Sequence, residues 1–348
     1  MLLVSLVWGF TGSADAGVAG ETVASVNSDA ISVLDLREAL GFWGGGVSVS
    51  GIAARKKKEV LDRLIDGRLL EQSARSKGLD KTDKFRDLLG QRESGLLIPA
   101  LFRGEVASRV KISKEEIRAE AGRLRKADKD LSAEDARMRA TGAVWEQKIR
   151  KAEEELVATA RKEAAVTFNE ETLGKIGGSD NVLDNAVLGT AGSENVTYAD
   201  VKKLLERMGG GKHNTRDLSG NPAAVRGVLE RDLTQIALTV YAKKMRAEES
   251  EWMRRVRREL ERSILIDGLT ERVILKGVTV TDKEIREAYA RHSGMLVRDG
   301  KPIPLSDVKE EIRRIVQGDK RKAAIGKYVG ELRKKAKIKI YEKLLPKI

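Results

Sequence analysis

Apolar residues recur every three or four positions over two long stretches of the chain. The first stretch contains Val60, Leu61, Leu64, Ile65 and Leu69, and the second contains Val225, Val228, Leu229, Leu233, Ile236 and Val240. This spacing places the apolar side chains on one face of a helix, so each stretch predicts an amphipathic helix. The first helix should end at Gly78, because glycine readily adopts the left-handed conformation that closes many helices.

Two further pairs of long helices are predicted from the same periodicity. One pair covers about residues 83–108 and 248–275, and the other begins near Leu131 and Leu305. Both helices of the second pair should give way to a short alternating strand near their ends.

Two helix-start signals share one design. Thr281 can accept a hydrogen bond from the backbone N–H of Glu284, while the Glu284 carboxylate accepts from the N–H of Thr281. Ser113 and Glu116 stand in the same relation 168 residues earlier. Each signal follows a short β-prone run, so we predict a strand-like segment that turns directly into a helix.

Residues 22–32 predict a β-hairpin that leads into a helix. Two apolar runs flank an Asn-Ser-Asp turn, and Ser32 with Asp35 forms a start signal for a helix that reaches Leu40. Residues 193–205 repeat the hairpin end and the helix. A glycine-containing loop follows each helix.

The chain therefore repeats one order of elements. Matching pairs include Val110/Val278, Ile112/Val280, Ser113/Thr281, Glu116/Glu284, Ile117/Ile285, Arg118/Arg286, Ile31/Val196, Ser32/Thr197, Asp35/Asp200 and Leu40/Leu205. Such duplication predicts a mostly α fold of two repeated helical modules, each closed by a small β-hairpin and strand element. We place the modules at residues 17–176 and 182–348, joined by a linker at 177–181. The strand at the end of each module should pair with the hairpin that opens the same module.

The N-terminus is similar to a secretory signal peptide. An apolar run from Leu2 to Phe10 precedes Ala14-Asp-Ala16, a small-x-small cleavage pattern, so residues 1–16 should be removed and the mature chain should begin near Gly17. The usual basic residues before the run are missing, as they would be if the start codon were set too late. A buried N-terminal segment is the alternative. We expect a periplasmic protein with no stable membrane span.

Composition favours helices and an acidic partner. Of 348 residues, 41% are hydrophobic and 34% charged, only 4% are aromatic, and the net charge is +13. A positive surface raises the rate of encounter with acidic polypeptides, nucleic acids or anionic lipids. Because the basic residues are interleaved with glutamate along predicted helices, we expect solvated helix faces and no nucleic-acid site.

No catalytic or metal site stands out in the sequence. The absence of cysteine excludes disulfides and thiolate chemistry, and no histidine or acidic spacing suits a metal. His213 and His292 lie beside glycine and are expected on surface loops. The Gly209–Lys212 run lacks the spacing of a phosphate-binding loop and predicts only a loop. We expect no enzyme activity, no metal and no cofactor.

The order of elements, with the signal at residues 278–286, resembles the chaperone region of SurA-like and PrsA-like parvulin foldases. The run from Val60 to Leu79 resembles the family's signature helix, and the ends of both halves resemble its C-terminal helix and strand. In that family a catalytic parvulin domain precedes the C-terminal helix, where this chain has only residues 119–130 and 290–304. Neither segment is long enough for a domain. The resemblance therefore implies a duplicated chaperone without isomerase domains.

A chaperone of this class would hold unfolded or nascent secreted polypeptides, including clients bound for the outer membrane, without ATP. Candidate client-binding residues are Phe42 and Trp43 in a glycine-rich loop, Trp252 and Met253 at the start of a basic helix, and Phe85 and Phe102 on its counterpart. Core packing is the alternative for each of them. Two other functions remain open: a structural or assembly protein with one fixed partner or a strand-swapped homodimer, and a prolyl isomerase with an unfamiliar site.

Overall fold

The structure of the chain is a computed structural model in which helices dominate and the strands form small antiparallel sheets. It describes residues 20–43, 52–178, 182–208, 218–292, 294, 296–298 and 301–347; side chains at 42, 43, 298, 301, 302 and 347 are outside this description. The expected signal peptide, residues 179–181 of the expected linker and the loop with His213 also lie outside the described residues. The predicted mostly α fold class is confirmed.

The chain divides into two compact units, each built from both halves of the sequence. Unit 1 comprises Met1–Gln91 and Arg258–Ile348, and unit 2 comprises Arg92–Arg257. Both boundaries fall inside helices, α3 (Asp83–Ser94) and α10 (Glu251–Leu269). The compact units therefore do not follow the division at 177–181, because each unit combines the beginning of one half with the end of the other.

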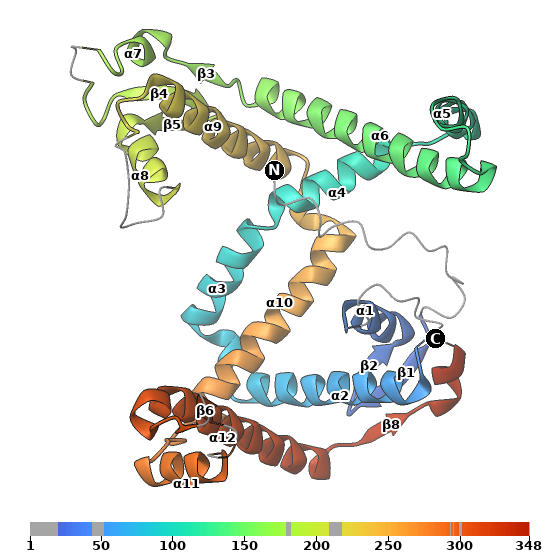
Figure 1. The fold of residues 1–348 in the computed structure, drawn as a ribbon, viewed down its shortest axis with the longest axis vertical. Coiled ribbons are helices and arrows are strands. Elements are labelled where there is room, and N and C mark those ends of the chain that lie inside the picture. Colours follow the sequence, from blue (N-terminus) through green and yellow to red (C-terminus); the bar gives the residue numbers. More distant parts are fainter. Residues whose placement is uncertain are drawn as a thin grey trace. The chain divides into compact units, whose positions relative to one another are not determined.

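The elements of the two units can be followed in Figure 1. Those of unit 1 are β1 (Thr22–Val26), β2 (Asp29–Ser32), α1 (Val33–Trp43), α2 (Ala54–Ser76), η2 (Leu79–Lys81), η4 (Thr270–Ile274), α11 (Asp282–His292), β6 (Val297–Arg298), β7 (Lys301–Pro302), α12 (Leu305–Lys335), β8 (Ile338–Ile340) and η5 (Glu342–Lys347). Those of unit 2 are α4 (Leu97–Arg109), α5 (Lys114–Ala127), α6 (Ala133–Glu163), β3 (Thr167–Phe168), α7 (Glu170–Gly174), β4 (Val187–Ala191), β5 (Glu194–Thr197), α8 (Tyr198–Met208), α9 (Pro222–Lys244) and η3 (Ala247–Glu249).

The two halves present similar elements in the same order. Helices α1 and α8 each have 11 residues, α2 and α9 each have 23, and α6 and α12 each have 31. Equal order and length do not by themselves make two self-contained modules, since each compact unit draws on both halves.

Each three-stranded sheet takes its third strand from the other half of the sequence. The order in unit 1 is β2-β1-β8, with Ser25 opposite Lys339, and the order in unit 2 is β3-β4-β5, with Thr167 opposite Thr190. The tail of each half is the end of its 31-residue helix, α6 or α12, with the strand that follows, β3 or β8. Our prediction that each tail strand pairs with the hairpin of its own half is wrong. The two tails and the two hairpins have the same alternation, so the local pattern fits either partner.

A separate apolar core lies beneath each sheet. In unit 1 it includes Ile31, Leu61 and Ile65, and in unit 2 it includes Val196, Leu229 and Leu233, all buried. Burial of such a side chain contributes roughly 1.5–3 kcal/mol. The predicted apolar stripes of α2 and α9 thus face the cores, although Leu64, Ile236 and Val240 are only partly buried.

One arginine from each tail clamps the long helix of the other half. In unit 1, Arg333 of α12 donates to Asp66 at 2.5 Å and to Asp62 at 3.2 Å, both on α2. In unit 2, Arg161 of α6 donates to Glu230 and Thr234 of α9, each at 3.1 Å. Asp62 and Asp66 precede Glu230 and Thr234 by 168 residues, so the two clamps occupy equivalent places.

The helix ends confirm several start and stop signals. Gly78 takes the left-handed conformation with φ 70°, as expected after α2. Its counterpart after α9 is Arg246, with φ 52°, where a side chain costs roughly 1–2 kcal/mol. Arg246 also donates to Glu249, which holds the strained residue in the turn.

The helix expected over residues 83–108 is two helices, α3 and α4. The interruption lies at Gly95, four residues before Pro99. In a continuous helix the Pro99 ring would clash with the carbonyl of Gly95, so the chain breaks there. In the second half α10 runs on into a π-helical turn, η4, within the expected range 248–275.

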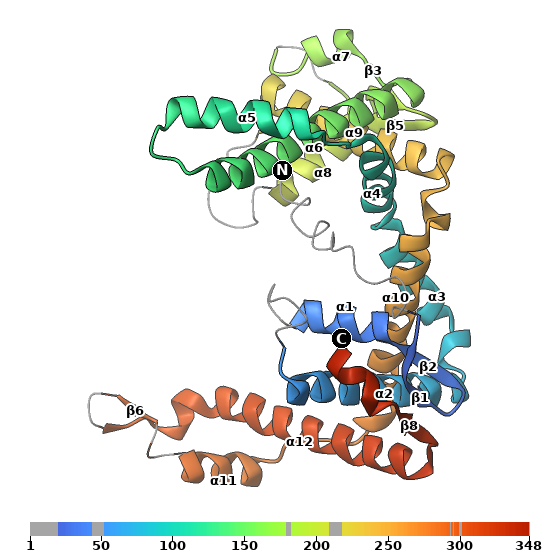
Figure 2. The ribbon, with the colours of Figure 1, turned by 90° about the vertical axis from the view of Figure 1, so that its right-hand side faces the viewer.

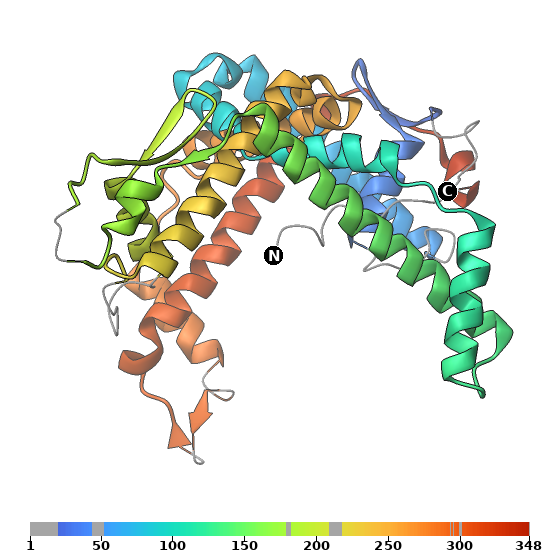
Figure 3. The ribbon, with the colours of Figure 1, turned by 90° about the horizontal axis from the view of Figure 1, so that it is seen from above.

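The helices α5 and α6 lie side by side in unit 2, as Figure 2 shows. Helix α11 lies along α12 in unit 1, and the β6–β7 hairpin extends beyond them (Figure 3). Residues 119–130, one of the two segments too short for a further domain, form most of α5 (114–127) and the turn after it.

Paired cysteine substitutions test the strand exchange in a chain that has no cysteine of its own. Ser25→Cys with Lys339→Cys, and separately Thr167→Cys with Thr190→Cys, should form intrachain disulfides on mild oxidation, because each pair faces across two strands. Faster migration on a non-reducing gel reports the closed loop.

The matched controls recombine the same substitutions within one half. Ser25→Cys with Thr167→Cys, and Thr190→Cys with Lys339→Cys, should remain uncross-linked. Cross-linking of these controls in place of the first two pairs would contradict the exchanged topology.

Candidate functional site

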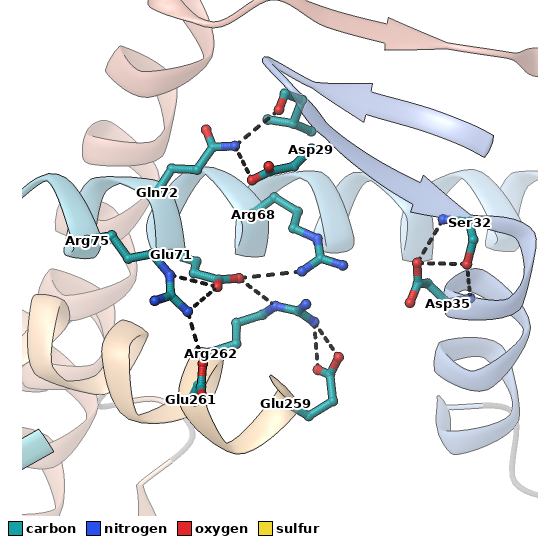
Figure 4. A network of polar contacts seen from close by, with 11 residues as sticks. Asp29, Ser32, Asp35, Arg68, Glu71, Gln72, Arg75, Glu259, Glu261 and Arg262 are labelled. Carbon is teal, nitrogen blue, oxygen red and sulfur yellow. Dashed lines mark hydrogen bonds and ion pairs between the residues drawn. The ribbon is translucent and has the colours of Figure 1, made fainter. Parts of the chain in front are cut away.

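Three arginines and three glutamates form a polar network where α2 meets α10 in unit 1 (Figure 4). Its members are Arg68, Glu71, Arg75, Glu259, Glu261 and Arg262. The Glu71 carboxylate lies at the centre and accepts from Arg75 and from Arg262, each at 3.0 Å. The Glu71 and Arg262 side chains are only 15% and 13% exposed. The network therefore acts as a fixed ionic joint between the two helices.

A second polar contact fixes the turn of the first hairpin on α2. The Gln72 amide donates to the carbonyl of Val26 at 3.1 Å and to the Asp29 carboxylate at 2.6 Å (Figure 4). Its carbonyl oxygen accepts from Asn27, which adopts a left-handed conformation with φ 56° in the turn. Gln72 thus holds the tip of the β1–β2 hairpin at the end of α2.

Each predicted capping box is also an anchor for a lysine from the neighbouring long helix. In unit 1, Lys320 of α12 donates to Glu284 at 2.6 Å and to the carbonyl of Thr279 at 2.5 Å. The capping bonds between Thr281 and Glu284 are present as predicted.

The same anchor occurs in unit 2. The Lys148 ammonium of α6 donates to Glu116 at 2.8 Å and to the Lys111 carbonyl, and the Ser113–Glu116 capping box is complete. Sequence reasoning found both capping boxes but missed both lysines. Each lysine lies more than 30 residues from its partner, on another helix, so no local pattern marks the pair.

These contacts favour the charged form of both glutamates. The Lys320 ammonium, together with the backbone and side chain of Thr281, lowers the pKa of Glu284 to about 2. Lys148 and Ser113 lower the pKa of Glu116 in the same way. The carboxylates therefore stay ionised over the physiological range and act as structural anchors.

The proposed client-binding residues lie in different surroundings. Phe85 and Met253 are buried, Phe85 in the core of unit 1 among Leu70 and Leu265. Phe102 and Trp252 in unit 2 are partly buried, and the Arg103 guanidinium lies 5.9 Å from the Trp252 ring. In this conformation Phe85 and Met253 contribute to packing and offer almost no surface to a client.

Phe42 and Trp43 belong to the end of a helix. We expected both in a glycine-rich loop after Leu40, whereas α1 continues through Trp43. Their side chains lie outside the described residues.

Other apolar side chains are exposed that the sequence did not single out. In unit 2 they are Met138, Leu183, Met208, Leu218 and Met245, and in unit 1 they are Val297, Ile315 and Tyr341. Three of the four methionines in the described residues are more than 40% exposed, and all three belong to unit 2. Hydrophobic scales alone would have assigned these residues to the core, since methionine is usually buried.

The described residues hold no cluster of three or more histidine, cysteine or acidic side chains arranged to bind a metal. His292 is the exposed last residue of α11. None of the described helices has both the length and the apolar run that a membrane crossing requires. The arrangement offers ionic joints and exposed apolar side chains.

Comparison with known proteins gives no family for this chain. No family model, no curated protein and no solved structure matches it.

Removal of the central carboxylate tests the ionic joint. Glu71→Ala should lower the free energy of unfolding by about 2 kcal/mol, because the largely buried Arg68 and Arg262 and the more exposed Arg75 lose a charged hydrogen-bond partner. Urea unfolding followed by circular dichroism measures the change. Glu331→Ala is the control, since its pair with Lys334 is exposed and should change stability by less than about 0.5 kcal/mol. Equal losses in both variants would contradict a central role for Glu71.

The lowered pKa of Glu284 predicts an acid-sensitive contact between α11 and α12. The pKa is about 2 in the folded chain and 4.5 ordinarily, so the unfolded chain binds the proton first as pH falls. The stabilisation by the Glu284–Lys320 contact is therefore complete above about pH 4.5 and is lost as the pH falls towards 2. Between pH 6 and pH 3 the melting temperature of the parent should fall by a few degrees more than that of Glu284→Gln.

Glu287→Gln supplies the control for this pH series. Its carboxylate lies 3.9 Å from Lys283 on the exposed face of the same helix, so this variant should follow the parent. An identical pH response of Glu284→Gln and the parent would rule out the anchor as the cause.

Proposed function

We propose that the chain is an ATP-independent holdase, a chaperone that binds unfolded secreted polypeptides and prevents their aggregation in the periplasm. The observation that carries the proposal is the exposure of Met138, Met208 and Met245, which as residues are 65%, 59% and 42% exposed. Methionine has a flexible and polarisable side chain that adapts to varied partners, and it is over-used on promiscuous binding surfaces.

The positions of these methionines favour several weak contacts over one deep pocket. Met138 belongs to α6, Met208 ends α8, and Met245 follows α9. A flexible client held at one point meets the next point at a raised effective concentration, so modest affinities at each are sufficient. This mechanism needs no nucleotide.

Charge supports the same proposal. The net charge of +13 attracts acidic unfolded chains at low salt and keeps the apolar contact points in solution. The family resemblance of the sequence to SurA-like and PrsA-like foldases points to the same class of client.

A light-scattering assay tests the proposal. An unfolded outer-membrane-type protein is diluted from denaturant with and without the purified chain, at low and at moderate salt. Suppressed scattering near a one-to-one ratio is expected. Replacement of Met138, Met208 and Met245 by serine should weaken the suppression several-fold. The control combines the neighbouring changes Arg139→Ser, Arg207→Ser and Lys243→Ser, which should leave the suppression unchanged at moderate salt.

Two results would overturn the holdase proposal. One is unchanged scattering in the presence of the chain at both salt concentrations. The other is equal activity of the methionine triple variant and the parent, which would remove the observation on which the proposal rests.

A strand-exchanged homodimer is the second candidate, and the exchange of tail strands inside the chain favours it. Strand β8 docks on β1 from the far end of the sequence, and the same contacts would form if β8 came from a second copy. In the Ser25→Cys, Lys339→Cys variant, a disulfide-linked dimer at micromolar concentration would support it.

A further inference from the structure

A small cavity that is open to solvent lies in unit 1 beside the hairpin turn that Gln72 holds. Its volume is about 250 Å³, and its lining residues are Asn27, Leu69, Gln72, Ser73, Ser76, Leu332, Lys335 and Ala336. Drug-sized ligands usually occupy roughly 300–1,000 Å³, so this cavity suits a single amino-acid side chain with its backbone ends.

The equivalent positions in unit 2 carry different side chains. There Val240 takes the position of Gln72 and packs against Gly192, whose Cβ, if present, would lie 3.3 Å from Val240. Lys244 and Glu163 take the positions of Ser76 and Lys335 and form an ion pair. The cavity in unit 1 thus arises from specific differences between the two halves.

The lining of the cavity combines an apolar floor with hydrogen-bond donors. Leu69, Leu332 and Ala336 supply the apolar part. The Lys335 residue is exposed, and among the described residues no hydrogen bond or ion pair engages its ammonium. The Asn27 amide gives one hydrogen to Gln72 at 2.7 Å and keeps the second.

Asp29, Ser73 and Ser76 already take part in hydrogen bonds. Gln72 donates to the Asp29 carboxylate at 2.6 Å, and Ser73 shares a hydrogen bond of 2.7 Å with Tyr328. Ser76 donates to the carbonyl of Ser73, which leaves its oxygen free to accept. The free donors therefore favour an anion, and the remaining acceptor favours an adjacent N–H group.

We infer that this cavity binds the carboxyl-terminal residue of a polypeptide when that residue is apolar and of moderate size, such as leucine or valine. Lys335 and Asn27 bind the terminal carboxylate, Ser76 accepts from the peptide N–H, and the side chain lies on Leu69 and Leu332. Capture of a terminal carboxylate is a known mode of peptide recognition. A free apolar amino acid presents the same carboxylate and side chain.

Fluorescence anisotropy with the full chain tests the inference. The probe is a dye-labelled peptide Gly-Ser-Gly-Ser-Leu with a free carboxylate, and the comparison probe is the same peptide with a C-terminal amide. The free acid should bind at least ten-fold more tightly than the amide. Competition by free leucine as strong as by unlabelled peptide assigns the site to amino acids, and weaker competition assigns it to chain ends.

Two variants separate this site from general attraction to a basic protein. Lys335→Glu should reduce binding of the free acid at least ten-fold, whereas Lys339→Glu, the same charge change on an exposed lysine outside the lining, should not. Ser76→Lys combined with Lys335→Glu rebuilds the ion pair of unit 2 and should also abolish binding. Its circular dichroism and melting temperature show whether it remains folded.

Equal binding of acid and amide, or equal losses in Lys335→Glu and Lys339→Glu, would overturn the inference. The test does not use client aggregation, so its outcome is independent of the holdase assay.

Discussion

The arginine clamps at the ends of the two longest helices are the contacts on which the architecture depends. Arg333 and Arg161 each cross from the tail of one half to the long helix of the other, and each tail strand follows a few residues later. A guanidinium presents several donors in a fixed plane, so it fixes both the position and the direction of the helix that carries it. Because β8 follows α12 after two residues, the position of α12 against α2 brings β8 beside β1.

The clamps belong to an arrangement of two cores that differs from the two consecutive modules expected from the sequence. Each core is closed by a helix and a strand that arrive from the other half. The pairs Lys58–Glu342 and Arg226–Glu170 occupy equivalent places beside these strands and add to the same contact. Ion pairs of this kind are individually weak when exposed, so the buried apolar cores supply most of the stability and the ion pairs add to it.

Local features of the fold could be predicted from the sequence because their causes are local. The capping boxes at Ser113 and Thr281, the stop at Gly78 and the apolar stripes of α2 and α9 all depend on residues within a few positions of one another. The exchange of strands could not be predicted, because either tail satisfies either hairpin. Lys148 and Lys320 were missed for a related reason, since their partners lie on other helices. The break before Pro99 also has a local cause, the geometry of the proline ring, although apolar periodicity alone predicts one continuous helix. The exposure of each apolar side chain decides whether it is available to a client, and the sequence does not give that exposure. Apolar character alone does not distinguish the buried Met253 from the exposed Met245.

In the sequence, unit 2 lies between the two segments of unit 1, and this sets an order on folding as the chain emerges from a ribosome. Unit 2 is continuous in sequence and can close as soon as residue 257 is free. Unit 1 cannot close then, because Asn27 in its first hairpin bonds to Lys337, 310 residues away. The apolar faces of β1 and α2 therefore stay exposed until β8 has been synthesised. Contacts between residues so far apart in the sequence also form slowly. A protein proposed to prevent the aggregation of other unfolded chains would therefore itself be prone to aggregate during its own synthesis.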